Sequence, residues 1–140
     1  MSPPSHKQTE GLAETERIAL ANTRIGQASF RSGVISLWGS CAVTGVVSEQ
    51  LLRASHIKPW RQCSNRECLD PANGLLLTPT LDHLFDRGLI TFESDEFIVI
   101  SESLASSDIA GLGVSTDMRL RWVPDGVVDY MRYHNQHVFT

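Results

Sequence analysis

The stretch "NGLLLTPTLDHLFDRG", residues 73–88, is the part of the sequence that decides the fold. Its first two residues are a turn signal, and the apolar run that follows predicts a short buried strand. Thr78 or Thr80 can cap a helix whose first turn holds Pro79. Gly88 is suited to end that helix. The segment therefore predicts a turn, a strand and a short helix in direct succession.

The predicted helix carries more ionisable side chains than a core segment usually tolerates. Asp82 and Asp86 are four residues apart, and His83 follows the first of them. Residues four apart share a helix face, so the two carboxylates repel each other unless a cation or basic partners lie between them. Oxygen ligands suit Mg²⁺ or Mn²⁺, so we expect a divalent metal here. The structural alternative is a dipole-favoured Asp82 and an Asp86 paired with a distant arginine.

The residues upstream add an imidazole to this pattern. "LLRASHIKPW", residues 51–60, predicts an extended stretch that carries His56 and is stopped by Pro59. Together the two segments predict a β-β-α arrangement: a strand with His56, a loop, a turn with Asn73, and a helix with the carboxylates. Histidine has an unperturbed pKa of about 6.5, which suits it to activate a water molecule near neutral pH. A histidine satisfied inside the core is the alternative.

The flanking segments predict helices and a hairpin. Residues 1–13 are polar and predict a disordered lead-in, and residues 14–40 predict two helices interrupted at Gly26. His134 and His137, three residues apart near the end of the chain, could share a metal, although surface or packing positions are the more common role of such a pair. The remaining elements expected are a strand or turn at "CAVTGVV" (41–47), a hairpin over 89–101, a strand "RLRWV" over 119–123 and a closing helix over 126–139.

Composition and charge narrow the class of protein. The chain has 140 residues, 41% hydrophobic and 20% charged, which is ordinary for one soluble domain. No apolar run approaches the roughly 20 residues that span a bilayer, and the N-terminus lacks a secretory pattern, so we expect a cytoplasmic protein without a membrane partner. The net charge of −4 counts against binding nucleic acid by general electrostatics alone. A local basic surface or a carboxylate-bound cation remains compatible with it.

The three cysteines, Cys41, Cys63 and Cys68, are too few and odd in number for a disulfide framework. We therefore expect reduced, partly buried thiols. A structural zinc site completed by a histidine is the alternative. The segment around the last two, "RQCSNRECLDPA" (residues 61–72), is polar and predicts a loop.

The motifs "CAVTG", "LLRASHIKPW" and "LDPANGLLLTPTLDHLFDRGLITF" resemble the HNH endonuclease family, in its restriction-endonuclease-like branch. The resemblance covers roughly residues 27–104, and "YMRYHNQHVF" is similar to the tail of such proteins. It implies an α+β protein with a ββα-metal (His-Me finger) core and metal-dependent hydrolysis of DNA phosphodiester bonds. The domains expected are a lead-in at 1–13, N-terminal helices at 14–40, the HNH core at 41–102 and an extension at 103–140 that packs on the core.

The resemblance also implies roles for individual residues. The first histidine of the motif falls on His56, which would be the general base. The asparagine falls on Asn73, which would brace the loop beside the base or contribute to the metal site. The helix ligand of the family falls on Asp82 rather than on His83, and a second ligand falls on Asp86. His83 stays a candidate metal ligand because it matches the motif by letter.

One ligand position of colicin-like members holds Ser55 here, so water or phosphate oxygens would complete the coordination of the metal. The cofactor expected is Mg²⁺ or Mn²⁺, with Zn²⁺ or Ni²⁺ as alternatives. DNA is the expected partner, with Lys58, Arg61 and Arg87 as candidates for phosphate contacts. A homodimer or a separate target-recognition domain could supply specificity, and the chain could be the catalytic fragment of a longer enzyme. The alternative function is a non-catalytic, metal-stabilised nucleic-acid-binding module.

Overall fold

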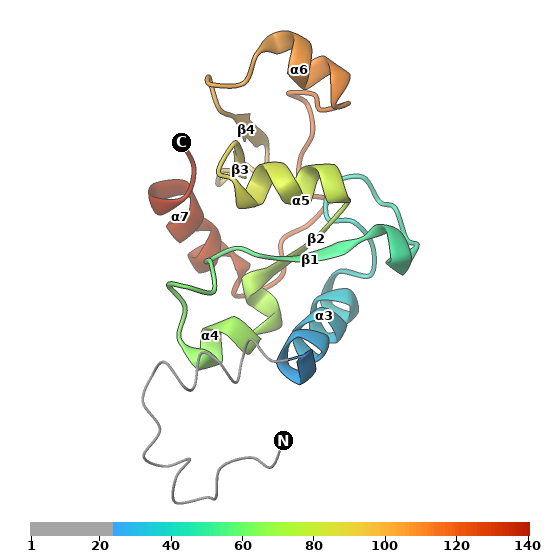
Figure 1. The fold of residues 1–140 in the computed structure, drawn as a ribbon, viewed down its shortest axis with the longest axis vertical. Helices are drawn as coiled ribbons and strands as arrows, with labels where there is room; N and C mark the ends of the chain where they lie inside the picture. Colours follow the sequence, from blue (N-terminus) through green and yellow to red (C-terminus); the bar gives the residue numbers. More distant parts are fainter. Residues whose placement is uncertain (1–23) are drawn as a thin grey trace, which may run out of the picture.

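Helices and two small antiparallel sheets make up the described part of the chain, residues 24–140 of the computed structural model (Figure 1). The α+β class is therefore confirmed. The expected lead-in at 1–13, and most of the first helix expected after it, lie outside the described residues. The elements are α3 (Arg24–Trp38), the 3₁₀ turn η1 (Glu49–Leu51), β1 (Arg53–His56), α4 (Asn65–Leu69), the 3₁₀ turn η2 (Pro71–Asn73), β2 (Gly74–Leu77), α5 (Pro79–Asp86), β3 (Ile90–Phe92), β4 (Ile98–Ile100), α6 (Ser106–Gly111) and α7 (Val127–His137).

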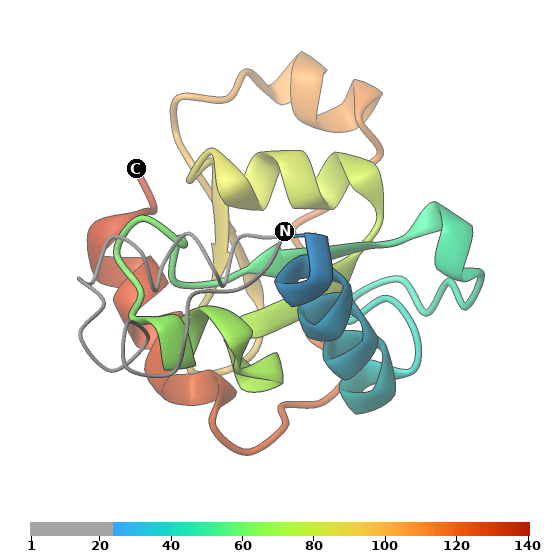
Figure 2. The same ribbon diagram turned by 60° about the horizontal axis from the view of Figure 1, so that its bottom comes forward.

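The centre of the fold is the antiparallel pair β1–β2, with α5 following directly. His56 lies opposite Gly74, and Arg53 lies opposite Leu77. Figures 1 and 2 show α5 on one side of this pair and α3 and α4 on the other, and both α3 and α5 contact the two strands. The predicted order of strand, loop, strand and helix is thus present, and the predicted helix start at Pro79 and end near Gly88 are confirmed.

The core explains why β2 tolerates no polar residue. All four of its residues are buried, and Phe30, Val34 and Trp38 of α3 pack against the same core. A Cβ atom added to Gly74 would lie 2.8 Å from the Phe30 ring, so the close approach of α3 requires glycine at this position. The predicted helix break at Gly26 is wrong: α3 runs through this residue, because burial of the helix outweighs the roughly 1 kcal/mol that glycine costs in a helix.

The predicted loop at 61–72 is wrong in part, because it contains the short helix α4. Ser64 accepts a hydrogen bond from the Glu67 backbone at 3.2 Å, and the Glu67 carboxylate accepts one from the Ser64 backbone at 2.8 Å. This reciprocal capping box satisfies two backbone donors that a helix start otherwise leaves unpaired. The signal Ser-x-x-Glu is present in the sequence and indicates this helix.

The cysteines also differ from the prediction. Cys63 and Cys68 form a disulfide across α4, with their Cα atoms 5.6 Å apart, whereas Cys41 is a free and buried thiol. The prediction of reduced thiols is confirmed for Cys41 and wrong for the other two. The zinc alternative is excluded for all three, because Cys41 packs in the main core and the paired sulfurs form a separate small cluster. The chain curls around α4 and brings residues 63 and 68 together, which their spacing alone does not reveal.

The C-terminal part differs from the prediction at the segment 119–123 and at α6, a helix that was not predicted. The hairpin β3–β4 and the closing helix α7 are present. The segment 119–123 is not a strand, because it pairs with the hairpin only through the single bridge between Phe97 and Arg119. Among residues 24–140, none of the helices has the length and apolar character needed to cross a membrane. The domain boundaries expected from the sequence remain predictions.

Candidate functional site

A cleft of about 600 Å³ opens between α3, η1, β1 and the first turn of α5. His56 at the end of β1 and Asp82 on α5 both line it. The register of β1 with β2 and the immediate start of α5 after β2 bring these two residues together. The cleft is also lined by three residues that the sequence did not single out, namely Arg31, Arg53 and Trp60.

The imidazole of His56 is held on two sides. Its ring stacks on Phe30, with centroids 3.8 Å apart and planes 3° from parallel. Its Nε2 lies 2.8 Å from the carbonyl oxygen of Cys68. A carbonyl oxygen can only accept, so Nε2 carries the proton and Nδ1 keeps the lone pair of the neutral ring. Among the described residues, we find no hydrogen-bond partner of Nδ1.

The surroundings of His56 also favour the neutral ring. Burial lowers its pKa below the usual 6.5, and the Cys68 carbonyl and the negative charge of Asp86 oppose that shift only in part. Near pH 7 the ring is therefore neutral. A neutral imidazole with a lone pair on Nδ1 is the form that can accept a proton from water.

Asp82 is half-buried and faces two opposing influences. Burial raises the pKa of its carboxyl group, and the charge of Asp86 raises it further. A hydrogen bond from the Ser55 hydroxyl and the positive charge of Arg53 lower it. Ser55, at the ligand position of colicin-like members, is thus close enough to Asp82 to affect its pKa. A cation beside the two carboxylates would relieve their mutual repulsion.

The other two candidate ligands lie at the margin of the site. Asp86 and His83 are exposed and do not line the cleft, although the charge of Asp86 acts on both His56 and Asp82. Within residues 24–140, no group of three or more His, Cys, Asp or Glu side chains is arranged to hold a metal ion. Two carboxylates fit Mg²⁺ or Mn²⁺, which keep several waters and take oxygen ligands from phosphates. They fit Zn²⁺ or Ni²⁺ less well, because these ions favour nitrogen and sulfur ligands.

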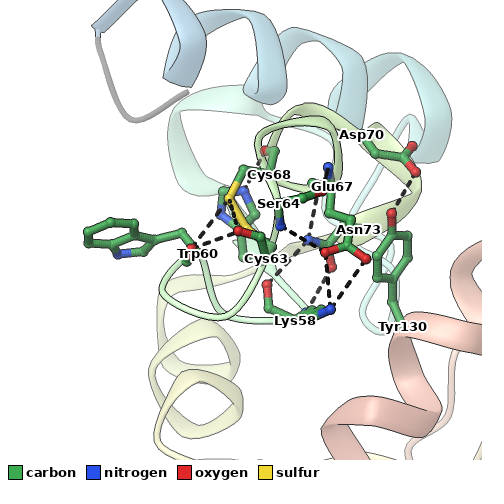
Figure 3. The surroundings of a disulfide bond; sticks show 10 residues. Lys58, Trp60, Cys63, Ser64, Glu67, Cys68, Asp70, Asn73 and Tyr130 are labelled. Carbon is green, nitrogen blue, oxygen red and sulfur yellow. Dashed lines mark hydrogen bonds and ion pairs between the residues drawn. A yellow bond between two sulfur atoms is a disulfide. The ribbon is translucent and has the colours of Figure 1, made fainter. Parts of the chain in front are cut away.

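Asn73 is fully buried and bonded on every side. Its Oδ1 accepts from the backbone N–H of Lys58 at 2.8 Å, and its Nδ2 donates to the carbonyls of Lys58 at 3.2 Å and Glu67 at 3.1 Å (Figure 3). The amide thus ties the chain just after β1 to α4. Of the two roles implied for this residue, these hydrogen bonds suit the brace.

The three cations proposed for phosphate contacts are not in the cleft. Lys58 pairs with the Glu67 carboxylate at 3.0 Å and lies 5.0 Å from the Tyr133 ring, so it braces the same loop as Asn73. Arg61 and Arg87 are exposed and do not line the cleft. Arg53 does line it, and its spacing from His56 on β1 is no signal for this, because residues three apart on a strand point to opposite faces.

His134 and His137 do not form a metal site. The Nδ1 of His134 lies 2.8 Å from the Thr91 hydroxyl, and its Nε2 lies 2.9 Å from the Phe85 carbonyl. Both ring nitrogens therefore have partners inside the core. His137 is exposed and lies against the ring of Tyr133. The packing alternative is confirmed for His134.

A comparison with known families finds a match that includes β1 and α5, the elements that carry His56 and Asp82. Residues 41–93 match the family model described as HNH endonuclease, and the matched segment contains β1, α4, β2, α5 and β3. Among curated proteins, a search finds no match to this chain. An HNH domain indicates a nuclease-type function. The similarity of this chain to the HNH endonuclease family thus covers residues 41–93.

Proposed function

We propose that this protein is a metal-dependent endonuclease that hydrolyses DNA phosphodiester bonds, with His56 as the general base and one divalent cation on the α5 face of Asp82 and Asp86. The ββα-metal core of the HNH family is the fold we assign to β1, β2 and α5. The observation that carries the proposal is the cleft, whose lining includes both the neutral imidazole of His56, with its Nδ1 lone pair, and the carboxylate of Asp82.

The chemistry assigned to the chain is a proton transfer. Nδ1 of His56 takes a proton from a water molecule, which then attacks the phosphorus of the scissile phosphate. The Cys68 carbonyl stabilises the imidazolium that forms, because it accepts a hydrogen bond from the Nε2–H group throughout. When bound, a divalent cation supplies charge stabilisation of the transition state and of the leaving 3′ oxygen. Asp82 and Asp86 would hold that cation.

The arginines of the cleft support a phosphate-bearing substrate. Arg53 is exposed on the cleft wall. Arg31 is anchored by hydrogen bonds to the carbonyls of Leu52 at 2.9 Å and Glu49 at 2.7 Å. These two cations provide a local basic surface in a chain of net charge −4, and guanidinium groups suit phosphate oxygens. We assign the phosphate contacts to them in preference to Lys58.

The test is relaxation of supercoiled plasmid DNA by the purified protein in Mg²⁺ or Mn²⁺. We expect cleavage that EDTA abolishes, and a loss of roughly 10²–10⁴-fold in rate for His56→Ala, the usual contribution of a positioned general base. His137→Ala is the matched control, because this histidine is exposed on α7 and does not line the cleft. Cleavage by His56→Ala at the wild-type rate would exclude the mechanism.

A non-catalytic module that binds nucleic acid is the second candidate, and one observation favours it. The described residues bring no third protein ligand to the two carboxylates. In that case removal of the metal would lower the melting temperature, and DNA binding would persist without turnover. A homodimer partner or a separate recognition domain, which would set the cleavage sequence, remains a proposal, as does a cytoplasmic location.

A further inference from the structure

The disulfide lies next to the general base proposed above. Figure 3 shows the Cys63–Cys68 bond with Trp60 on one side and Asn73 and Lys58 on the other. Cys68 lines the cleft, and its carbonyl oxygen is the one that Nε2 of His56 contacts at 2.8 Å. A single residue therefore carries both the covalent link and the hydrogen bond that selects the tautomer of His56.

The short helix α4 depends on such links. Five residues are too few for a helix to be stable by itself. The capping box holds the start of α4, and the disulfide ties its fourth residue back to Cys63, just before the cap. The closed loop is short, so its effect on the entropy of the unfolded chain is smaller than that of a long loop. The main consequence of the bond is therefore local order in α4.

The other links to this loop act on a neighbouring residue. Asn73 binds the carbonyl of Glu67, and Lys58 binds its carboxylate. Neither of these two side chains makes a hydrogen bond to Cys68. The side chain of Cys68 is fixed by the disulfide, and its backbone N–H donates to Ser64 at 2.9 Å. Loss of the covalent link would remove the tie between the Cys68 side chain and Cys63, and the position of the Cys68 carbonyl would be restrained less.

The surroundings of the two sulfurs accommodate the reduced state as well. The sulfur atoms of Cys63 and Cys68 lie 3.3 and 3.5 Å from the carbonyl oxygen of Trp60. A disulfide has no proton to donate to that oxygen, whereas each thiol of the reduced pair has one. The reduced pair would thus find an acceptor already in place.

We propose that the Cys63–Cys68 disulfide is a positioning element of the site, which makes the activity depend on the redox state of this pair. The closed bond holds the Cys68 carbonyl on Nε2 of His56 and keeps Nδ1 free for the substrate side. A dithiol reductant opens it by thiol–disulfide exchange: the two thiols of the reductant give two electrons and two protons to the pair and become a disulfide themselves. The ring of His56 then loses its fixed tautomer. The activity readout of this inference rests on the proposed function.

The experiment uses the whole protein purified without reductant. Thiol titration under denaturing conditions should count one free thiol, that of Cys41, before treatment with dithiothreitol and all three afterwards. Long-range ¹H–¹⁵N spectra should show His56 protonated on Nε2 in the oxidised protein and a mixture of tautomers in the reduced protein. We expect kcat for plasmid cleavage to fall by roughly tenfold on reduction, a part of the contribution of the base. KM should change little, and the melting temperature should fall by several degrees at most, because the closed loop is short.

Two variants make the assignment specific. Cys63→Ala/Cys68→Ala should show the lower kcat with or without reductant. Cys41→Ala, which removes the cysteine outside the pair, should respond to reductant as the wild type does. Three free thiols in the untreated protein, or the same tautomer and kcat in both redox states, would overturn the inference. A protein without cleavage in either state would instead contradict the proposed function, and the tautomer of His56 would still decide the inference.

Discussion

Two histidines of this protein have nearly the same surroundings and differ at one ring nitrogen. His56 stacks on Phe30 and His134 stacks on Phe85, with centroids 3.8 Å apart in both pairs. In each ring Nε2 lies against a backbone carbonyl, that of Cys68 or that of Phe85, and burial lowers the pKa of both rings. Two identical-looking histidines can therefore have different roles.

The difference lies at Nδ1. In His134 this nitrogen is bonded to the hydroxyl of Thr91 at 2.8 Å, so the ring is fully satisfied. In His56 we find no partner for it in the described part of the chain, and the ring lines a cleft that His134 does not reach. Stacking and a carbonyl partner thus indicate only that a histidine ring is fixed in place. A ring nitrogen without a partner, in a ring that lines a cleft, is what indicates a catalytic role.

The largest effect expected from this comparison is on cleavage. His56→Ala should lower kcat by roughly 10²–10⁴-fold, because it removes the base. His134→Phe, which keeps an aromatic ring beside Phe85, should retain a kcat within about threefold of wild type per folded molecule, since no atom of His134 lines the cleft. Steady-state kinetics on a fluorescent duplex would measure both. Equal losses in the two variants would show that the comparison is wrong.

For stability we expect the opposite order, with the larger loss at His134 and the smaller one at His56. His134→Ala removes a buried ring together with its hydrogen bonds to the Phe85 carbonyl and the Thr91 hydroxyl, so we expect a loss of about 4 kcal/mol in the free energy of unfolding. His56→Ala should cost about 2 kcal/mol or less, because His56 is only partly buried. Urea denaturation followed by circular dichroism would give both values. A larger loss for His56→Ala would contradict the structural role assigned to His134.

The pH dependence of stability should carry the signature of His134. Burial lowers its pKa from 6.5 to about 4 in the folded protein. Below pH 6.5 the unfolded chain binds a proton here that the folded chain does not, so stability falls as the pH decreases from 6.5 and levels off near 4. At about 1.4 kcal/mol per pH unit, His134 alone would account for about 3 kcal/mol. His134→Phe should lose this contribution, and His137→Ala should keep it.

The patterns that could be read from the sequence are those in which neighbouring residues determine the outcome. The apolar run of β2 and the end of α5 at Gly88 are of this kind. The offset of Asp82 from Asn73 is as well, because it is set within one strand and one helical turn. The Ser-x-x-Glu capping box at Ser64 is also of this kind and indicates α4, although a loop was the prediction for this segment.

The features that could not be read depend on segments far apart in the chain. Arg31 reaches the cleft only because α3 packs across β1, and Lys58 is drawn away from it by Glu67 and by Tyr133 on α7. The contrast between the two histidines has the same origin, since the partner of Nδ1 in His134 comes from β3, 43 residues earlier. Sequence spacing does not contain that information.

The smallest effect sharpens the comparison most directly, because it changes only the Nδ1 partner. Thr91→Val removes the hydroxyl that bonds Nδ1 of His134 and that also accepts from Nδ2 of Asn135 at 2.8 Å. It keeps the shape of the side chain, so the loss of stability should be about 1–3 kcal/mol, the cost of leaving a buried polar group unpaired. Cleavage should be unchanged, because the cleft is untouched. A wild-type kcat in this variant would show that the Nδ1 partner of His134 has a structural role and no role in cleavage. A cleavage rate that falls with stability in Thr91→Val would mean instead that α7 controls the cleft through β3.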